Sequence, residues 1–337
     1  MPKCISHILR PSDRVFYRHK IRRVSRDIAW QTTREDFDIM HAHTLYSDGG
    51  VALRFSRLRS IPYVVTVRNT DLNLFAKFRP DLSRERNNIL ANAAQITVLS
   101  PAYADRLCKL VGRSMSQSVM RKVTVIPNGI EQHWFDDTTR VVPRSHHVRL
   151  LFVGSFDRGK NVSRLLDAVA IIARSQPIEL TLVGGGGNHA GVVESKLASG
   201  RFSFASFLGR IDDPDELRKV YRDHDIFVMP SLHETFGLVY IEALSQGLPI
   251  IHSHMEGVDG FFEKTGVAFA VDPRDTKDIA RKLSSSLSTY RSVGPKCREQ
   301  AKRFQWSGIA QEYLQVYRSA MTNESGGLQQ HWKASEP

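Results

Sequence analysis

Cysteine is scarce in this chain of 337 residues. The three cysteines, Cys4, Cys108 and Cys297, are odd in number, far apart in the sequence and without a CxxC spacing. This pattern indicates neither a disulfide framework nor a structural zinc site. A reducing compartment such as the cytoplasm fits this cysteine content best.

Long apolar runs are also missing. No stretch approaches the roughly 18 uninterrupted apolar residues that a membrane-spanning helix needs. The N-terminal segment carries Arg10, Asp13 and Arg14 where a signal peptide would have its apolar core. No segment repeats with the period of a solenoid. We therefore expect a cytoplasmic protein whose membrane contact, if it has one, is peripheral and on the cytoplasmic face.

Acidic residues are scarce in the first half only. The formal net charge is +12, and residues 1–145 hold 24 Lys and Arg against 13 Asp and Glu, whereas residues 146–337 hold 23 against 22. A basic surplus suits nucleic acid or an anionic membrane. No known nucleic-acid module is recognisable, and aromatic residues such as Tyr63, Phe75 and Phe78 fit core positions. We expect no nucleic-acid partner, and a solvated or membrane-facing basic surface in the first half.

A basic helix is expected at 14–30. Its basic residues are Arg14, Arg18, Lys20, Arg22, Arg23 and Arg26, and its apolar residues include Val15, Phe16, Ile21 and Val24. This mixture suits an amphipathic helix on anionic lipid. A solvated helix that covers a sheet is the alternative.

The second half alternates short apolar runs with helical patterns. Strands are expected at 149–155, 179–184, 202–209, 225–231 and 249–253, and helices at 162–173, 190–197, 215–224 and 237–246. Buried strands that alternate with helices of this length predict βαβ units and a parallel sheet. In such sheets, ligands bind beyond the carboxyl ends of the strands.

The first half shows the same pattern less regularly. Strands are expected at 37–41, 63–67, 95–99 and 122–126, which predicts a second α/β domain. A polar linker with Pro143 is expected at 138–147. We therefore expect a first domain at 1–140, a second at 148–303 and a polar tail at 322–337.

The densest motif is the block PSLHETFGLVYIEALSQGLP at 230–249. Glu234 and Glu242 are eight residues apart, with Gly237 and a helical pattern between them. Backbone N–H groups at 236–238 would point out of the start of this helix, where a phosphate finds free donors and the positive end of the helix dipole. A pair of glutamates on a helix is a weak signal alone, but here it directly follows a predicted strand.

This block resembles the E-x7-E signature of retaining glycosyltransferases of family 4. Their fold is GT-B, in which two Rossmann-like domains face each other across a cleft and the C-terminal domain holds the nucleotide-sugar donor. Other segments resemble the family in order and spacing: 38–48, 66–71, PNGIE at 127–131, LFVGSFDRGKNVSRLLDA at 151–168 and the closing helix at 304–317. The resemblance extends over most of the chain, and it implies that a helix at 304–321 crosses back to the first domain.

The resemblance implies roles for the matching residues. Glu242 would accept hydrogen bonds from the donor ribose, Glu234 would face the donor sugar, and Lys160 would neutralise the departing diphosphate. The implied catalytic residues are Glu234, Lys160 and Arg158; the donor-binding residues are Gly154, Ser155, Gly184, Gly185, Phe236, Gly237, Leu238 and Glu242; the acceptor-side residues are His43, Asp48, Arg68, Asp71 and Asn128.

The implied activity is retaining transfer of a hexosyl group from a nucleotide sugar. The acceptor would be lipid-linked or an oligosaccharide, in polysaccharide, lipopolysaccharide or glycolipid biosynthesis of the cell envelope. The resemblance implies no cofactor and no metal. A truncated donor-binding pseudoenzyme, or a partner subunit without turnover, is the alternative function.

The sequence departs from the family pattern at several points. Ser155 stands where many relatives have arginine, and Arg158 is the expected replacement cation. Arg68 stands where histidine is common, and Glu256-Gly257 replaces the usual pair of glycines. Only 37 residues precede Asp38. We therefore expect the first domain to lack one or more opening βα units, in a fragment, a mis-started reading frame or a reduced form.

Two other enzyme classes have weaker support. The run 185–190 fits G-x-G-x-x-A of dinucleotide-binding folds, but no carboxylate follows near 206–210. Asp-x-Asp pairs at 36–38, 213–215 and 223–225 match a metal-binding pattern, yet helix capping and strand ends explain them better. The histidine pairs at 41–43 and 252–254 have no evident third metal ligand.

Overall fold

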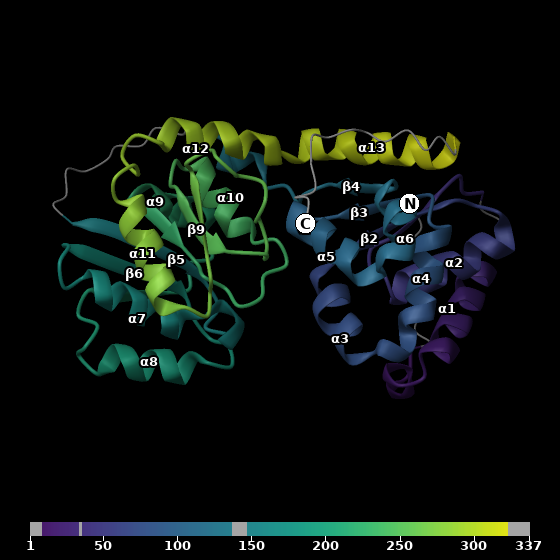
Figure 1. Ribbon diagram of the computed structural model, residues 1–337, viewed down its shortest axis with the longest axis horizontal. Coiled ribbons are helices and arrows are strands. Elements are labelled where there is room, and N and C mark those ends of the chain that lie inside the picture. The colour runs from purple at the N-terminus through teal and green to yellow at the C-terminus, as the bar shows by residue number, and fades with distance from the viewer. Residues whose placement is uncertain (1–8, 34–35, 137–146, 323–337) are drawn as a thin grey trace. The chain divides into compact units, whose positions relative to one another are not determined.

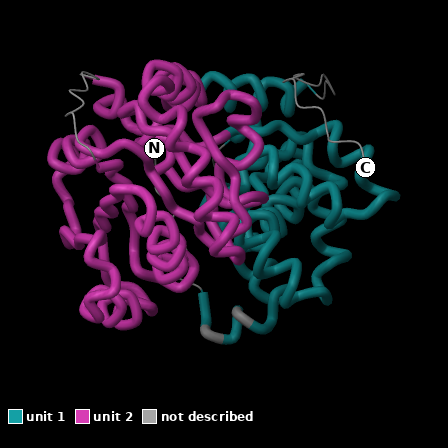
Figure 2. Tube along the Cα trace, turned by 60° about the vertical axis from the view of Figure 1, so that its left-hand side comes forward, with its two compact units in different colours: residues 1–126, 310–337 teal, residues 127–309 magenta. Residues whose placement is uncertain are grey.

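The computed structural model describes residues 9–33, 36–136 and 147–322 (Figure 1). The chain divides into two compact units, unit 1 with residues 1–126 and 310–337 and unit 2 with residues 127–309 (Figure 2). The expected linker at 138–147 and tail at 322–337 lie outside the described residues except at His147 and Thr322. The two units are described separately below.

Unit 1 contains a parallel sheet in the order β1-β2-β3-β4. Its strands are β1 (Met40–Ala42), β2 (Tyr63–Val67), β3 (Gln95–Val98) and β4 (Val123–Val125). All residues of β2 and β3 are buried, as expected for parallel strands that are covered on both faces. The helices are α1 (Tyr17–Gln31), α2 (Ser47–Arg59), α3 (Ala76–Phe78), α4 (Ser83–Asn92), α5 (Pro101–Val111) and α6 (Arg113–Met120).

The two faces of the unit 1 sheet have different neighbours. Val65 faces α2, because a Cβ atom on Gly49 would lie 3.3 Å from its Cγ2 atom. Thr66, the next residue of β2, points to the opposite face. There its hydroxyl contacts His41, and the side chain of Tyr313 from α13 (Trp306–Thr322) forms a hydrogen bond with it. The second half of α13 therefore covers this face of the sheet.

Helix α1 packs its apolar side against α2. Tyr17 and Ile21 are buried one turn apart, and the Tyr17 hydroxyl donates a 2.7 Å hydrogen bond to the carbonyl of Tyr46. Gly50 of α2 provides the space, since a Cβ atom there would collide with the Tyr17 hydroxyl. Ile21 is thus covered by α2 and is not available to a lipid surface. The helix begins at Tyr17 rather than at residue 14, since the 3-10 turn Pro11–Arg14 precedes it.

Unit 2 contains a six-stranded parallel sheet in the order β10-β9-β8-β5-β6-β7. Its strands are β5 (Val148–Gly154), β6 (Ile178–Gly184), β7 (Ala205–Gly209), β8 (Ile226–Val228), β9 (Ile250–Ser253) and β10 (Ala268–Val271). This is the Rossmann strand order. Strands β6 and β7 are added on one side of β5, and strands β8, β9 and β10 are added on its other side, so the strand order reverses between the neighbours β5 and β8. The prediction of α/β architecture with two Rossmann-like halves is confirmed.

Helices lie on both faces of the unit 2 sheet. They are α7 (Val162–Ile172), α8 (Ala190–Ala198), α9 (Pro214–Arg222), α10 (Leu238–Ser245), α11 (Thr276–Ser286) and α12 (Gly294–Ala301). Helix α7 connects β5 to β6, and α10 connects β8 to β9, which is a step in the opposite direction across the sheet. Because such connections are right-handed, the two helices lie on opposite faces of the sheet. Helix α7 packs with α8 and α11, and α10 packs with α12 (Figure 1).

Short turns complete both units. Besides Pro11–Arg14 they are the π-helix Asp71–Phe75 and the 3-10 turns Pro80–Leu82, Gln132–Trp134, Arg158–Lys160 and Lys302–Phe304. In the ranges that the structure describes, no helix combines the length and the apolar character needed to span a bilayer.

Candidate active site

An ion pair joins the loops that follow the two central strands of unit 2. The Lys160 Nζ atom lies 2.6 Å from a carboxylate oxygen of Glu234, and the Glu234 side chain is only 9% exposed. Lys160 follows β5 and Glu234 follows β8. These strands are the neighbours at which the strand order reverses, and there open α/β sheets bind their ligands.

The backbone of these two loops is fixed by Asn161. This residue has a left-handed φ of 62°, which ends the turn Arg158–Lys160. Its side-chain amide donates to the carbonyls of Pro230 and Pro273 at 2.9 and 2.7 Å. The carbonyl of Gly159 accepts a 2.7 Å hydrogen bond from Leu232. The position of Lys160 relative to Glu234 is therefore set by backbone contacts as well as by the ion pair.

Glu256 is a part of this site that the sequence-based site prediction did not include. Its Oε2 atom accepts a 3.0 Å hydrogen bond from the backbone N–H of Glu234, and its side chain is buried. Gly257 follows with a φ of 55°, and a Cβ atom there would lie 2.7 Å from the carbonyl of Phe236. The sequence signal for Glu256 was its place in the position of the first glycine of the family's usual pair. Only the second glycine, Gly257, is required by the close approach to the Phe236 carbonyl.

Glu242 lies in α10 with a desolvated carboxyl group. Burial raises the pKa of Glu242 to about 7, and the hydrogen bond from the Tyr221 hydroxyl, 3.0 Å long, opposes that rise. Tyr221 comes from α9 and is fully buried. Glu242 can therefore change its protonation state near neutral pH.

The glycines after β6 allow a close approach of two loops. Gly184 and Gly185 have φ values of 122° and 117°, and a Cβ atom on Gly184 would collide with the carbonyl of Gly154. The hydroxyl of Ser155 donates a 2.6 Å hydrogen bond to Asp157, which also accepts from the backbone N–H of Asn188 at 3.0 Å. Ser155 thus organises this loop, whereas the side chain of Arg158 is exposed.

At the start of α10, backbone N–H groups are available to a ligand, whereas the side chain of Phe236 is buried. Phe236 is 1% exposed, and its ring packs near Phe261 and Phe304. Gly237 has a φ of 83°, and Leu238, the first residue of α10, is 40% exposed. The first N–H groups of a helix have no intrahelical acceptor. The predicted donor contact of Phe236 therefore depends on its backbone.

Asp71 connects the loops that follow β1 and β2 in unit 1. Its buried carboxylate accepts hydrogen bonds from the backbone N–H groups of Leu45 at 3.0 Å and Arg68 at 2.9 Å. Burial raises the pKa of Asp71, and these backbone hydrogen bonds lower it. The Arg68 guanidinium donates to the carbonyl of His43 at 2.7 Å. Asp71 and Arg68 thus hold the carboxyl ends of two neighbouring strands together.

The other predicted acceptor-side residues are less constrained. His43 and Asp48 are exposed, and the His43 ring lies 4.2 Å from that of His41. Asn128 is half-buried and belongs to unit 2. The structure therefore brings His43, Arg68 and Asp71 into one group, and it places Asp48 one turn away at the start of α2.

Comparison with known proteins decides the family. Residues 5–134 match the profile described as Glycosyltransferase Family 4, and residues 147–289 match the profile described as Glycosyl transferases group 1. The chain belongs to the family 4 glycosyltransferases. This membership excludes the dinucleotide-dependent oxidoreductase that the run at 185–190 suggested.

Two relatives show how far the similarity of this glycosyltransferase extends. A D-inositol 3-phosphate glycosyltransferase of Paenarthrobacter aurescens is 27% identical over 331 residues, which is 90% of this chain and 78% of the relative. A glycogen synthase of Mycobacterium tuberculosis is 26% identical over 321 residues, covering 90% of this chain and 73% of the relative. Both similarities include parts of units 1 and 2.

Solved structures confirm the GT-B fold of the glycosyltransferase. Sucrose-phosphate synthase of Thermosynechococcus elongatus matches with a TM-score of 0.72 and 23% identity over 93% of this chain and 81% of that chain. Anabaena HepE in complex with UDP matches with a TM-score of 0.70 and 18% identity over 89% of this chain and 82% of that chain.

Two of the motifs that match metal-binding patterns make contacts within the protein. Asp213 caps α9, since its carboxylate accepts from the backbone N–H groups of Asp215 and Glu216 at 2.8 and 3.1 Å. His252 and His254 both lie near Asp259, at 3.8 and 3.1 Å. Across residues 9–33, 36–136 and 147–322, no group of three or more His, Cys, Asp or Glu side chains is arranged to hold a metal ion.

Proposed function

We propose that this glycosyltransferase moves a hexosyl group from a nucleotide sugar to an acceptor hydroxyl with retention of the anomeric configuration. The contact between Lys160 and Glu234, beyond the ends of β5 and β8, is the observation that carries the proposal. A cation and a carboxylate are held there by fixed backbone, in the place where this sheet type binds nucleotides.

Lys160 is proposed to stabilise the departing nucleotide diphosphate. Negative charge grows on the diphosphate as the glycosidic bond breaks, and a fixed ammonium group lowers the free energy of that transition state without transferring a proton. Arg158, exposed on the same loop, is proposed as a second cation. With cations supplied by the protein, we propose that transfer requires neither a metal nor another cofactor.

The two glutamates of the signature are proposed to hold the donor at its two ends. Glu242 accepts the ribose hydroxyls, for which an ionised carboxylate offers two acceptor oxygens. Glu234 orients the hydroxyls of the sugar, with its backbone fixed by Glu256. Gly154, Ser155, Gly184 and Gly185, with the backbone of residues 236–238, are proposed to line the donor. The complexes of Anabaena HepE with UDP and with UDP-glucose support this class of donor.

Acceptor recognition is proposed for unit 1. His43, Asp48, Arg68 and Asp71 lie at the carboxyl ends of β1 and β2, and Asn128 is proposed as a further acceptor-side residue. The acceptor class would be a lipid-linked or oligosaccharide hydroxyl in polysaccharide, lipopolysaccharide or glycolipid biosynthesis. The basic surplus of residues 1–145 supports peripheral contact with an anionic membrane at its cytoplasmic face.

Transfer assays test this proposal. The full chain would be incubated with a panel of nucleotide sugars and with lipid-linked or oligosaccharide acceptors, and products would be identified by mass spectrometry. We expect transfer with at least one donor, and a loss of about 100-fold or more in kcat for Lys160→Ala. Lys219→Ala, which removes an exposed lysine of α9, is the matched control. Equal activity of both variants would overturn the role of Lys160.

A further inference from the structure

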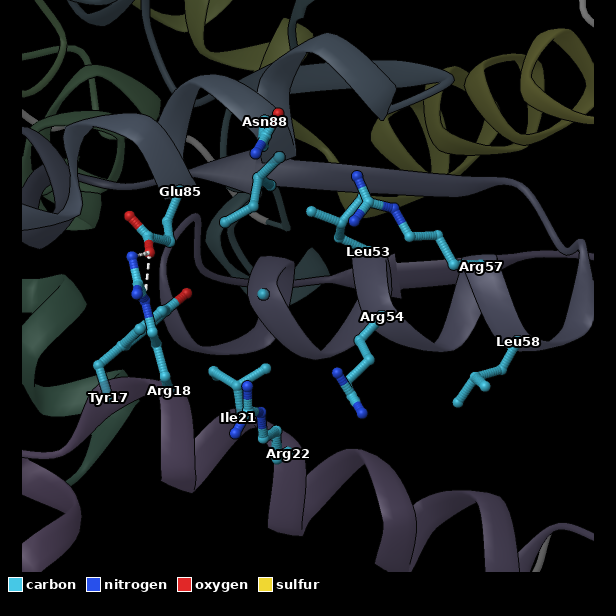
Figure 3. Close-up of a pocket in the computed structure, with 12 residues that line it drawn as sticks. Tyr17, Arg18, Ile21, Arg22, Leu53, Arg54, Arg57, Leu58, Glu85 and Asn88 are labelled. Carbon is cyan, nitrogen blue, oxygen red and sulfur yellow. Dashed lines mark hydrogen bonds and ion pairs between the residues drawn. The ribbon is translucent and has the colours of Figure 1, made fainter.

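A pocket of about 410 Å³ lies in unit 1 between α1, α2 and α4 (Figure 3). Its lining includes the second half of α2, from Leu53 to Leu58, which leads to the amino end of β2. It includes none of the donor residues proposed above, and none of the acceptor-side residues at the carboxyl ends of β1 and β2. The proposed function therefore leaves this pocket without a use.

The lining of the pocket is strongly basic. Four of its residues are arginines, namely Arg18, Arg22, Arg54 and Arg57. Glu85 is the only acidic residue in the lining, and the guanidinium of Arg18 already contacts it at 2.5 Å. The formal charge of the lining is thus positive by three, and an anion is the ligand that complements it.

Two buried polar atoms of the pocket residues lack a hydrogen-bond partner within the described part of the chain. They are the Nε donor of Arg54 and the Oε2 acceptor of Glu85. Buried polar atoms are nearly always satisfied in proteins, so each such atom calls for a partner. Arg54 and Glu85 both line the pocket, so a ligand that offers an acceptor to the guanidinium and a donor to the carboxylate would complement them.

Most of the remaining lining is apolar. Ile21 and Leu53 lie beside the arginines, and Leu58 at the edge of the pocket is 59% exposed. Phe16, which precedes the lining residue Tyr17, is 59% exposed. Exposed aromatic residues next to arginines are typical of surfaces that meet lipid head groups.

We propose that this pocket binds the phosphate ester of a polyol, with the phosphate on the arginines that line it and a free hydroxyl on Glu85. Arginine is suited to phosphate because its planar guanidinium donates two parallel hydrogen bonds. The same chemistry occurs in a free polyol phosphate and in the head group of a phosphatidylglycerol lipid. This site goes beyond the proposed transfer reaction, because no donor or acceptor residue of that reaction takes part in it.

Binding measurements with two probes test the proposal and separate the two sources. Glycerol 3-phosphate would be titrated into the full chain by calorimetry, and phosphatidylcholine vesicles with and without phosphatidylglycerol would be tested by co-sedimentation. Binding of glycerol 3-phosphate identifies a soluble ligand. Binding of the phosphatidylglycerol vesicles alone identifies a lipid head group. Either result supports the site, and failure of both probes overturns it.

Matched variants separate the pocket from general charge attraction. The double variant Arg54→Gln with Arg57→Gln should weaken binding at least about tenfold, because charge-assisted hydrogen bonds are lost. Arg26→Gln removes one exposed arginine of α1 outside the pocket and should leave binding nearly unchanged. Arg57→Gln alone keeps the test informative if the double variant does not fold. Equal losses in Arg26→Gln and Arg57→Gln would overturn the pocket as the binding site.

Discussion

The hydroxyl of Tyr221 donates a 3.0 Å hydrogen bond to Glu242, and this contact links α9 to α10 at the proposed ribose site. The hydrogen bond favours the ionised carboxylate, whereas burial favours its protonated form. Burial has the larger effect, and the pKa of Glu242 is raised to about 7. Donor binding and protein stability should therefore both depend on pH near neutrality.

Donor affinity should fall when the solution becomes acidic. If ribose hydroxyls bind the ionised form of Glu242, affinity for a nucleotide sugar at pH 6 should be about tenfold weaker than at pH 8. A nucleotide sugar is the right probe, since its esterified diphosphate does not titrate in this range. Calorimetric titrations from pH 5.5 to 8.5 would measure the effect. Glu242→Gln should bind more weakly and without this pH dependence, and an unchanged slope in that variant would contradict the assignment.

Removing the charge of Glu242 should stabilise the ligand-free protein at alkaline pH. The folded pKa of about 7 is above the ordinary value of 4.5, so stability falls as pH rises between these values. Above pH 7 the ionised Glu242 lowers the free energy of unfolding by its full amount, which is at most about 3 kcal/mol. Glu242→Gln should therefore unfold at a higher urea concentration than the wild type at pH 8, with the difference vanishing below pH 4.5. The exposed Glu299→Gln serves as control and should show no such difference.

Glu256 should act by positioning Glu234. Glu256→Ala removes the acceptor of the Glu234 backbone N–H and should cost about 1–2 kcal/mol of stability. Its KM for the nucleotide sugar should rise more than kcat falls, since donor binding is disturbed first. Glu256→Gln retains an acceptor oxygen and should restore most of the affinity. Steady-state kinetics of both variants measure this, and a Gln variant as impaired as Ala would show that the charge, not the hydrogen bond, matters.

His41 should make unit 1 sensitive to acid. Its two ring nitrogens lie 2.7 Å from the Tyr317 hydroxyl and 2.8 Å from the Thr66 hydroxyl, so it joins α13 to the sheet. Burial, and then the charges of His43 and Arg68, lower the pKa of His41 to about 4. The unfolded chain binds a proton below about pH 6.5, so stability should fall between pH 6.5 and 4.

The variant His41→Gln isolates this effect from that of other buried histidines. Its loss of stability between pH 7 and pH 5 should be smaller than that of the wild type, by about 1 kcal/mol for this partly exposed ring. Thermal unfolding at the two pH values provides the measurement. Parallel losses in the two proteins would show that His41 is not the sensitive group.

The fold of unit 2 was largely predictable because its strands are strongly apolar. The prediction of a helix at 162–173 agrees with α7 within one residue, since buried apolar residues recur along one side of that helix. Strand β10 was not predicted, because Ala268–Val271 is a short run without alternation or a strong turn signal. Strand β8 is shorter than expected, and Asp225 just before it accepts hydrogen bonds from the backbone and guanidinium of Arg149.

The site was predictable only where sequence motifs mark it. Lys160 and Glu234 belong to motifs, and the structure brings them together although 74 residues separate them. Tyr221 and Glu256 carry no motif of their own, because their importance comes from the tertiary contacts of their side chains. The partner of α1 stayed open for a similar reason: its sequence shows an apolar side, and only the packing of Gly50 of α2 against it shows what covers that side.

The anomeric configuration of the first product tests the proposed function most directly. The glycosyltransferase would be supplied with a nucleotide sugar of α configuration and an acceptor found in the transfer assay, and the reaction would be followed by proton NMR. We predict that the new glycosidic bond is α, and that Lys160→Ala forms it far more slowly than Lys219→Ala. A β-linked product, or no product with any donor, would contradict the proposal.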